Sequence, residues 1–69
     1  MNSTINSQVI VCYELYFESL LQPGRGLAFP CDAEGHVNMD AMSARARNNY
    51  LFARALVGIE LDIPRVRTT

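Results

Sequence analysis

The chain contains no lysine: all six of its cations are arginines, seven acids oppose them, and the formal net charge is −1. Binding to a nucleic-acid backbone needs several phosphate contacts from a basic surface. The even balance of charges therefore disfavours that class of protein, although it excludes no partner outright. Arginine also suits planar recognition of carboxylates, so individual arginines stay candidates for specific contacts.

Cysteines and long apolar runs are also scarce. The two cysteines, Cys12 and Cys31, are too few for a disulfide scaffold of the secreted type. Residues 1–7 lack the positive start of a signal peptide. The longest apolar run, residues 9–13, is far shorter than the roughly 20 residues that span a bilayer. We therefore expect a cytoplasmic protein with reduced thiols and no membrane association.

No group of residues has the spacing of a known catalytic or metal site. Cys31, Asp32 and His36 lie close together in the sequence, but a metal needs three or four convergent ligands, and this spacing matches none of the usual zinc patterns. A cysteine nucleophile with His36 as base would need a pocket that excludes water. A chain of 69 residues has little room for one. We expect no catalytic residue, no metal and no cofactor.

Residues 9–17 carry an apolar side chain at every odd position, and the even positions are mixed. This period of two predicts a half-buried strand. A helix over residues 9–21 is the competing interpretation, since the segment contains several good helix formers and Ser7 could cap it. A helix would scatter the apolar side chains around its circumference, so we prefer the strand. Its core-facing residues would be Val9, Val11, Tyr13, Leu15 and Phe17.

Residues 23–26, with the sequence Pro-Gly-Arg-Gly, form the strongest break in the chain and predict a turn. They lack the lysine and Ser/Thr of a phosphate-binding loop, so Arg25 at the tip is expected to be a contact residue. A second strand is predicted over residues 27–37, with a short hairpin loop at Asp32–Gly35. Pro30 favours an edge position for this strand.

A long helix is predicted over residues 39–57. Asn38 is a good N-cap, Asp40 suits the positive end of the helix dipole, and Gly58 is typical of a C′ residue. Beyond it, residues 59–63 alternate between aliphatic and acidic side chains and predict a brief strand that ends before Pro64. Residues 65–69 are expected to be a loose tail.

The predicted helix has two apolar sides, whereas a surface helix needs only one. One side is expected to pack on the first strand; its residues are Met39, Met42, Ala46, Tyr50, Ala53 and Val57. The other side would be buried by the remaining strands or by a partner. It has small residues that allow close approach and two bulky residues that could anchor an interface; its members are Ala44, Asn48, Leu51, Phe52 and Ala55.

The sequence therefore predicts a single α+β domain in which a β-hairpin packs on one long helix, with a possible short C-terminal strand. We expect a non-catalytic interaction or regulatory module, associating as a homodimer and binding through this second helix side and Arg25. The alternative is a small nucleic-acid binder, in which Arg47 and Arg54, on one side of the helix, would contact phosphates.

Overall fold

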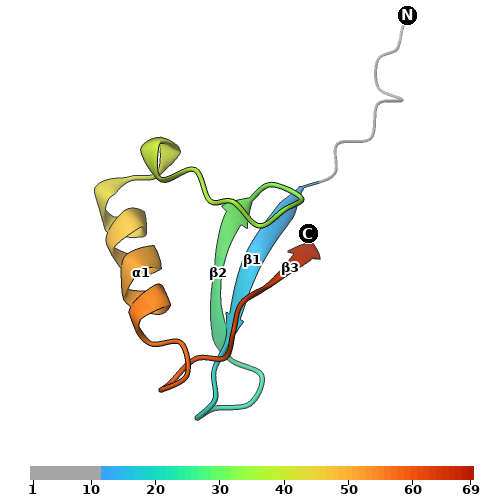
Figure 1. Cartoon of the computed structure of the whole chain (residues 1–69), viewed down its shortest axis with the longest axis vertical. Coiled ribbons are helices and arrows are strands. Elements are labelled where there is room, and N and C mark those ends of the chain that lie inside the picture. Colours follow the sequence, from blue (N-terminus) through green and yellow to red (C-terminus); the bar gives the residue numbers. More distant parts are fainter. Residues whose placement is uncertain (1–11) are drawn as a thin grey trace, which may run out of the picture.

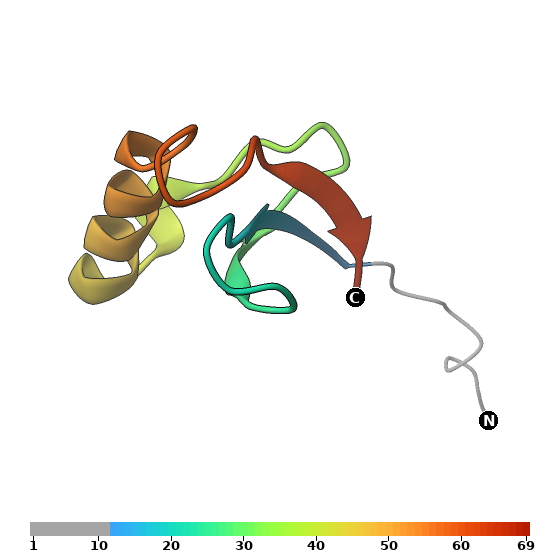
Figure 2. The same cartoon turned by 90° about the horizontal axis from the view of Figure 1, so that it is seen from below.

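The computed structural model describes residues 12–69 and shows a small α+β fold (Figure 1). In this part of the chain, β1 (Tyr13–Glu18), β2 (Gly26–Cys31) and β3 (Arg65–Thr68) form one antiparallel sheet in the order β2-β1-β3. A single α-helix, α1 (Ala44–Ala55), lies beside the sheet, nearer to β2 than to β3 (Figures 1 and 2). The predicted fold class is confirmed. No helix in residues 12–69 is long and apolar enough to cross a membrane.

β1 is the central strand and confirms the strand interpretation over the helical one for residues 13–18. The odd positions Leu15 and Phe17 are buried, with exposed fractions of 5% and 0%, as the period of two predicts. Tyr13 is half-buried. The predicted core positions Val9 and Val11 lie outside the described residues.

β2 ends at Cys31, six residues before the predicted end of the second strand at residue 37. Asp32 stops it: its Oδ1 accepts the backbone N–H groups of Glu34 and His36 at 3.0 and 2.7 Å. The backbone N–H of Asp32 also donates to the carbonyl of His36 at 3.1 Å, and Gly35 has a φ of +88°. This side-chain turn competes with strand pairing, so residues 32–38 form a loop and not a returning strand.

The predicted helix over residues 39–57 is in fact two helices. A 3₁₀ helix, Met39–Ala41, has Asn38 as its N-cap, and Met42 is extended with a ψ of 149°. Ser43 then caps α1, because its Oγ accepts the backbone N–H of Ala46 at 3.1 Å. Asn38, the predicted cap of the long helix, therefore caps only the 3₁₀ helix, and Ser43, a residue type equally suited to N-caps, begins α1.

The C-terminal strand is present but lies later than predicted. Residues 59–63 do not form a strand, because Ile59 and Glu60 lie in a turn and Leu61 makes only isolated bridges. The expected loose tail, residues 65–69, supplies β3. α1 ends at Ala55 and is capped by Leu56. The Leu56 carbonyl then accepts the backbone N–H groups of the next turn, Ile59, Glu60 and Leu61, at 3.0 to 3.1 Å. Residues 60–62 make only isolated contacts with the end of β1: the Asp62 N–H donates to the Glu18 carbonyl at 2.8 Å, and Leu61 bridges to Ser19. The continuous pairing with β1 is made by the chain beyond Pro64.

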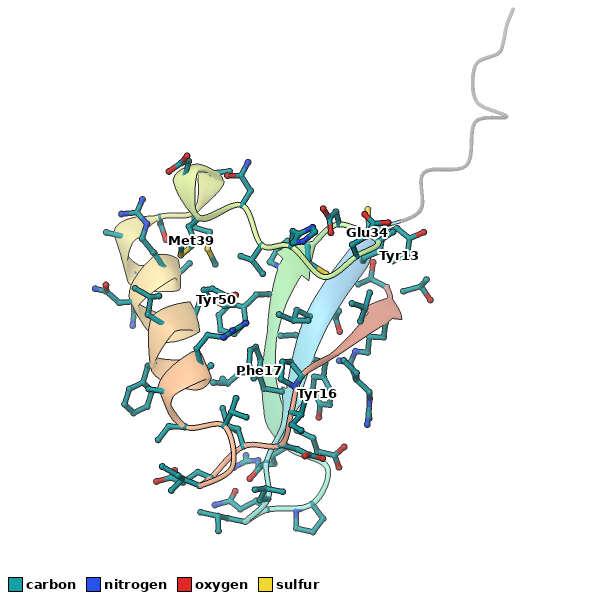
Figure 3. All side chains as sticks on the ribbon, in the orientation of Figure 1. Tyr13, Tyr16, Phe17, Glu34, Met39 and Tyr50 are labelled. Carbon is teal, nitrogen blue, oxygen red and sulfur yellow. The ribbon has the colours of Figure 1, made fainter. Side chains whose placement is uncertain are left out.

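The core lies between α1 and the sheet. Phe17 from β1, Phe29 from β2 and Tyr50 from α1 meet edge to face, with ring centroids 5.3 to 6.3 Å apart. Figure 3 shows Tyr50 and Phe17 pointing into the space between helix and sheet. Ala53 is fully buried beside them. The predicted core-facing side of the helix is thus confirmed at Tyr50 and Ala53, with Met42 and Val57 packed at its margin.

Candidate interaction surface

The side of α1 that faces away from the core is exposed along its whole length. Leu51 is 49% exposed and Phe52 is 63% exposed. At about 100° per residue, these side chains lie opposite Ala53 and Tyr50. We call this surface the outer face of α1; its members are Ala44, Asn48, Leu51, Phe52 and Ala55, and all five are exposed. The strands and loops of residues 12–69 therefore leave uncovered the helix side that the sequence singled out.

Arginines flank the outer face, and the helix contains no acid. Arg45 projects near Phe52, whereas Arg47 and Arg54 lie on the opposite flank, beside Leu51. The two arginines predicted as anion contacts are partly engaged within the fold. Arg47 Nε donates to the Met39 carbonyl at 3.2 Å, and Arg54 donates to the Tyr50 hydroxyl at 3.4 Å. The outer face is thus apolar at its centre and cationic at its edges.

Arg25 lies away from α1, in the loop between β1 and β2. Its guanidinium donates to the Gln22 side chain at 3.1 Å, and its carbonyl accepts the backbone N–H of Ser19 at 2.7 Å. Gly24, with a φ of +84°, makes the turn possible. The fold therefore does not place Arg25 on the outer face of α1.

Exposed aliphatic side chains also gather at one end of the molecule, where sequence reasoning predicted no surface. The β1–β2 loop and the segment after α1 lie side by side there (Figure 1), joined by a hydrogen bond of 2.8 Å from the Leu20 N–H to the Glu60 carbonyl. We call this the aliphatic end; its members are Leu20, Leu21, Ile59 and Ile63, and they are 51% to 74% exposed. The alternation of aliphatic and acidic residues over residues 59–63 was the sequence signal for this surface, although it was interpreted as a strand. In the structure, Leu61 is the one aliphatic residue of this segment that is buried in the core.

Exposed acids accompany the aliphatic end. Glu60 and Asp62 both lie on its surface. Within residues 12–69, the ion pairs are His36–Asp32, Arg65–Glu18 and Arg67–Glu14, and they include neither of these acids. The aliphatic end therefore carries acidic side chains, whereas α1 carries only cationic ones.

The outer face of the sheet, by contrast, is satisfied within the chain. Arg67 stacks on the Tyr16 ring, with its guanidinium carbon 3.8 Å from the ring centroid, and pairs with Glu14. Arg65 pairs with Glu18 at 3.2 Å. Figure 3 shows Tyr16 between β1 and β3. These contacts neutralise both C-terminal arginines.

The loop after β2 brings together three possible metal ligands. One ligand atom from each of Asp32, Glu34 and His36 lies within 4.8 Å of the others. All three side chains are exposed, and His36 Nδ1 lies 3.1 Å from Asp32 Oδ2. The His36 backbone N–H holds the pKa of the Asp32 carboxyl below the usual range, and the His36 side chain and then the Glu34 N–H lower this pKa further. The hydrogen bonds to Asp32 give this residue a structural role, because they hold the turn after β2 together.

Cys31 borders an open hollow of about 450 Å³ beside this loop. Partial burial raises the pKa of the Cys31 thiol, and the Asp32 and Glu14 carboxylates raise it further. Since the thiolate is the nucleophile and the metal ligand, this environment disfavours both roles. Cys12 is exposed at the start of β1 and is not in the hollow.

Comparison with protein-family models, curated proteins and solved structures finds no match to the chain. Any assignment of function therefore rests on the surfaces described above.

Proposed function

We propose that this protein is a non-catalytic interaction module that associates with a second copy of itself through the outer face of α1. The observation that carries the proposal is the exposure of Leu51 and Phe52 on a helix whose opposite side is already packed. Fully burying a side chain of this size stabilises a complex by about 1.5–3 kcal/mol. No element of residues 12–69 covers these two side chains, and a partner would bury them.

Size supports the proposal. A single core in so short a chain rarely supplies more than about 3–5 kcal/mol of net stability, and association is a common remedy. Five side chains make up the buried core of residues 12–69. A dimer would add the outer face to it. We propose that this association takes place in the cytoplasm, and that Arg25 adds a contact outside the helix.

Analytical ultracentrifugation of the wild type and of a Leu51→Glu/Phe52→Glu variant tests the proposal. We expect a wild-type dimer at micromolar concentration and a folded, monomeric variant, because two buried carboxylates would oppose association. Asn49→Glu adds a charge to the same helix outside the outer face and should leave the dimer intact. A monomeric wild type at the highest soluble concentration, or a variant that unfolds without dissociating first, would refute the proposal.

The nucleic-acid alternative has less support. Arg65 and Arg67 are paired with acids, and Arg47 and Arg54 donate to groups of the protein itself. Titration with DNA and RNA at two salt concentrations tests it, because phosphate contacts must weaken steeply as salt rises. Tight, salt-sensitive binding that is lost in Arg47→Gln/Arg54→Gln would favour this alternative over self-association.

A further inference from the structure

The two edges of the sheet differ in what their backbones offer to a further strand. In the order β2-β1-β3, both β2 and β3 are edge strands, and an edge strand presents unpaired N–H and C=O groups. The Ser19 N–H donates to the Arg25 carbonyl, and the Thr69 N–H donates to the Cys12 carbonyl. Because hydrogen-bonded and non-bonded pairs alternate along an antiparallel ladder, these two bonds fix which residues of each edge strand face outward.

The outward backbone groups of β2 belong to Gly26, Ala28 and Pro30. Pro30 has no N–H to donate, and a proline on an edge strand hinders the addition of another strand. The outward groups of β3 belong to Val66 and Thr68, each with one N–H and one C=O. In the described part of the chain, no turn or loop hydrogen bond uses these four groups. β3 also lies on the side of the sheet away from α1 (Figures 1 and 2), and we call its outward side the open edge.

Two arginines stand beside the open edge. Arg65 and Arg67 lie on the outer face of the sheet, where they contact Glu18 and Glu14. Each arginine engages its acid through a single nitrogen, Nη2 of Arg65 and Nε of Arg67. A guanidinium has five N–H donors, and the two side chains are 63% and 46% exposed. Both can therefore bind a second carboxylate without losing the first. On the opposite face, β3 presents Val66, which is 37% exposed.

A second copy of β3 does not fit the open edge, because outward residues pair with outward residues. If Val66 paired with its own counterpart, Arg65 would lie opposite Arg67. If Val66 paired with Thr68, Arg67 would lie opposite its own counterpart. Like charges directly opposite each other destabilise a strand pair. Residues 1–11 contain no acid, so they carry no counter-charge for the arginines. The charges favour a partner strand that places acids on the arginine face.

The strand that already pairs with β3 shows which sequence this surface accepts. β1 carries Glu14 and Glu18 on the face of the arginines and the buried Leu15 and Phe17 on the face of Val66. A strand with the same alternation on the open edge would give each arginine a second carboxylate and pack an apolar side chain beside Val66. We infer that the open edge of β3 binds an extended acidic segment of a partner protein, in which acids alternate with aliphatic residues. This surface is separate from the outer face of α1 and does not depend on self-association.

A short synthetic peptide in which glutamate and valine alternate is the probe. In an NMR titration, it should shift the amide signals of Val66 and Thr68 most and slow their hydrogen exchange, because these N–H groups would donate to the added strand. A peptide with lysine in place of glutamate should not bind. The glutamate–valine peptide N-methylated at alternate residues, on the side that faces β3, keeps its charge but lacks the N–H donors. It should bind about ten-fold more weakly.

Val66→Pro removes an outward N–H and leaves the hydrogen bonds between β3 and β1 in place. It should weaken peptide binding about five-fold, and Ala28→Pro, the matched change on the edge of β2, should not. Arg65→Gln/Arg67→Gln should weaken binding about ten-fold and remove most of its salt dependence. Circular dichroism confirms that each variant is folded. If Val66→Pro unfolds, the N-methylated peptide makes the same test on the wild type.

No binding of the glutamate–valine peptide at millimolar concentration would overturn the inference, and so would equal binding of the lysine or the N-methylated peptide. Weaker self-association of Val66→Pro would assign the open edge to a second copy and also overturn it. The Leu51→Glu/Phe52→Glu variant should bind the peptide like the wild type. A monomeric wild type that binds the peptide would refute the proposed function and support this inference.

Discussion

Two surfaces of this molecule point away from the core, and they are built differently. On the outer face of the sheet, Tyr16, Arg67 and Glu14 satisfy one another. On the outer face of α1, Leu51 and Phe52 contact nothing that buries them. A polar surface can be completed by its own neighbours, because ion pairs and stacking tolerate water. An apolar surface is completed only by excluding water, and residues 12–69 supply no further layer that does so.

This difference between the sheet and the helix indicates which of these two surfaces a partner would contact. The charges on the outer face of the sheet are already paired, and binding there would cost these existing contacts. The helix offers unpaired cations and exposed apolar area, and binding there costs little. Variants that probe the two surfaces and the core between them should therefore affect quite different properties.

The largest effect on folding is expected from the core. Phe17→Ala removes a fully buried ring that meets both Phe29 and Tyr50. Such a truncation costs about 3–5 kcal/mol, which matches the whole stability of a domain of this size. The variant should be unfolded at room temperature by circular dichroism. Phe52→Ala removes the same kind of side chain from the outer face of α1 and should stay folded. Similar losses of folding stability in both variants would contradict the contrast between the buried core and the exposed outer face.

Gly26→Ala should have the next largest effect. An added Cβ would meet the Phe17 carbonyl oxygen and come within 2.8 Å of the Tyr16 hydroxyl. The backbone carbonyl has no room to move in the paired strand, so we expect a loss of about 1–3 kcal/mol in urea denaturation. Gly24→Ala, where nothing lies within 4 Å of the added Cβ, isolates the cost of the positive φ. Equal stability of Gly26→Ala and the wild type would contradict this expectation and show that β1 and β2 can separate at this position without cost.

Arg67→Gln tests the outer face of the sheet. It removes the stacking on Tyr16 and the ion pair with Glu14. Exposed interactions of these kinds contribute about 0.5–1 kcal/mol each, so thermal denaturation should show a small loss that shrinks as salt rises. Dimerisation should be unaffected, because this surface lies outside the proposed contact. A change in the dimer affinity would place the interface on the sheet instead of the helix.

The smallest effect concerns acid stability and the Asp32 turn. The pKa of Asp32 is lower in the folded chain than in the unfolded one, mainly because its carboxylate accepts the His36 backbone N–H. The contribution of the ionised Asp32 carboxylate to folding stability is therefore fully present above the unfolded pKa. It is lost as the pH falls through the folded pKa. Asp32→Asn should lose less stability than the wild type between pH 7 and strongly acidic pH. Glu34→Gln, as the control, should follow the wild type.

Much of the core could be predicted from the sequence, because its signals are local. The alternation around Leu15 and Phe17 and the helical spacing of Tyr50 and Ala53 identified three buried residues and the partly buried Tyr50. The outer face of α1 followed from the same spacing. The boundaries were less accurate, since Asp32 and Ser43 each form a short hydrogen-bonded cap that interrupts a longer hydrophobic pattern.

The misplaced C-terminal strand shows why the rest of the fold could not be predicted from the sequence. Residues 59–63 alternate as a strand should, yet hydrogen bonds to the nearby Leu56 carbonyl hold residues 59–61 in a turn. Arg65 and Arg67 look like a basic tail, yet Glu18 and Glu14 on β1 pair with them. The second outcome depends on partners 47 and 53 residues away, which no local pattern reveals. The aliphatic end was missed for the same reason.

The pattern of apolar residues along the chain predicts which side chains prefer to leave water, and with them the α+β class, the first strand and the two apolar sides of the helix. Which of those side chains are buried follows from the packing of the whole fold. Phe17 and Ala53 do, because β2 and α1 close over β1, whereas Leu51, Phe52 and Ile59 do not. Hydrophobicity belongs to a residue, but burial depends on the layers that the folded chain assembles, and residues 12–69 assemble one sheet and one α-helix.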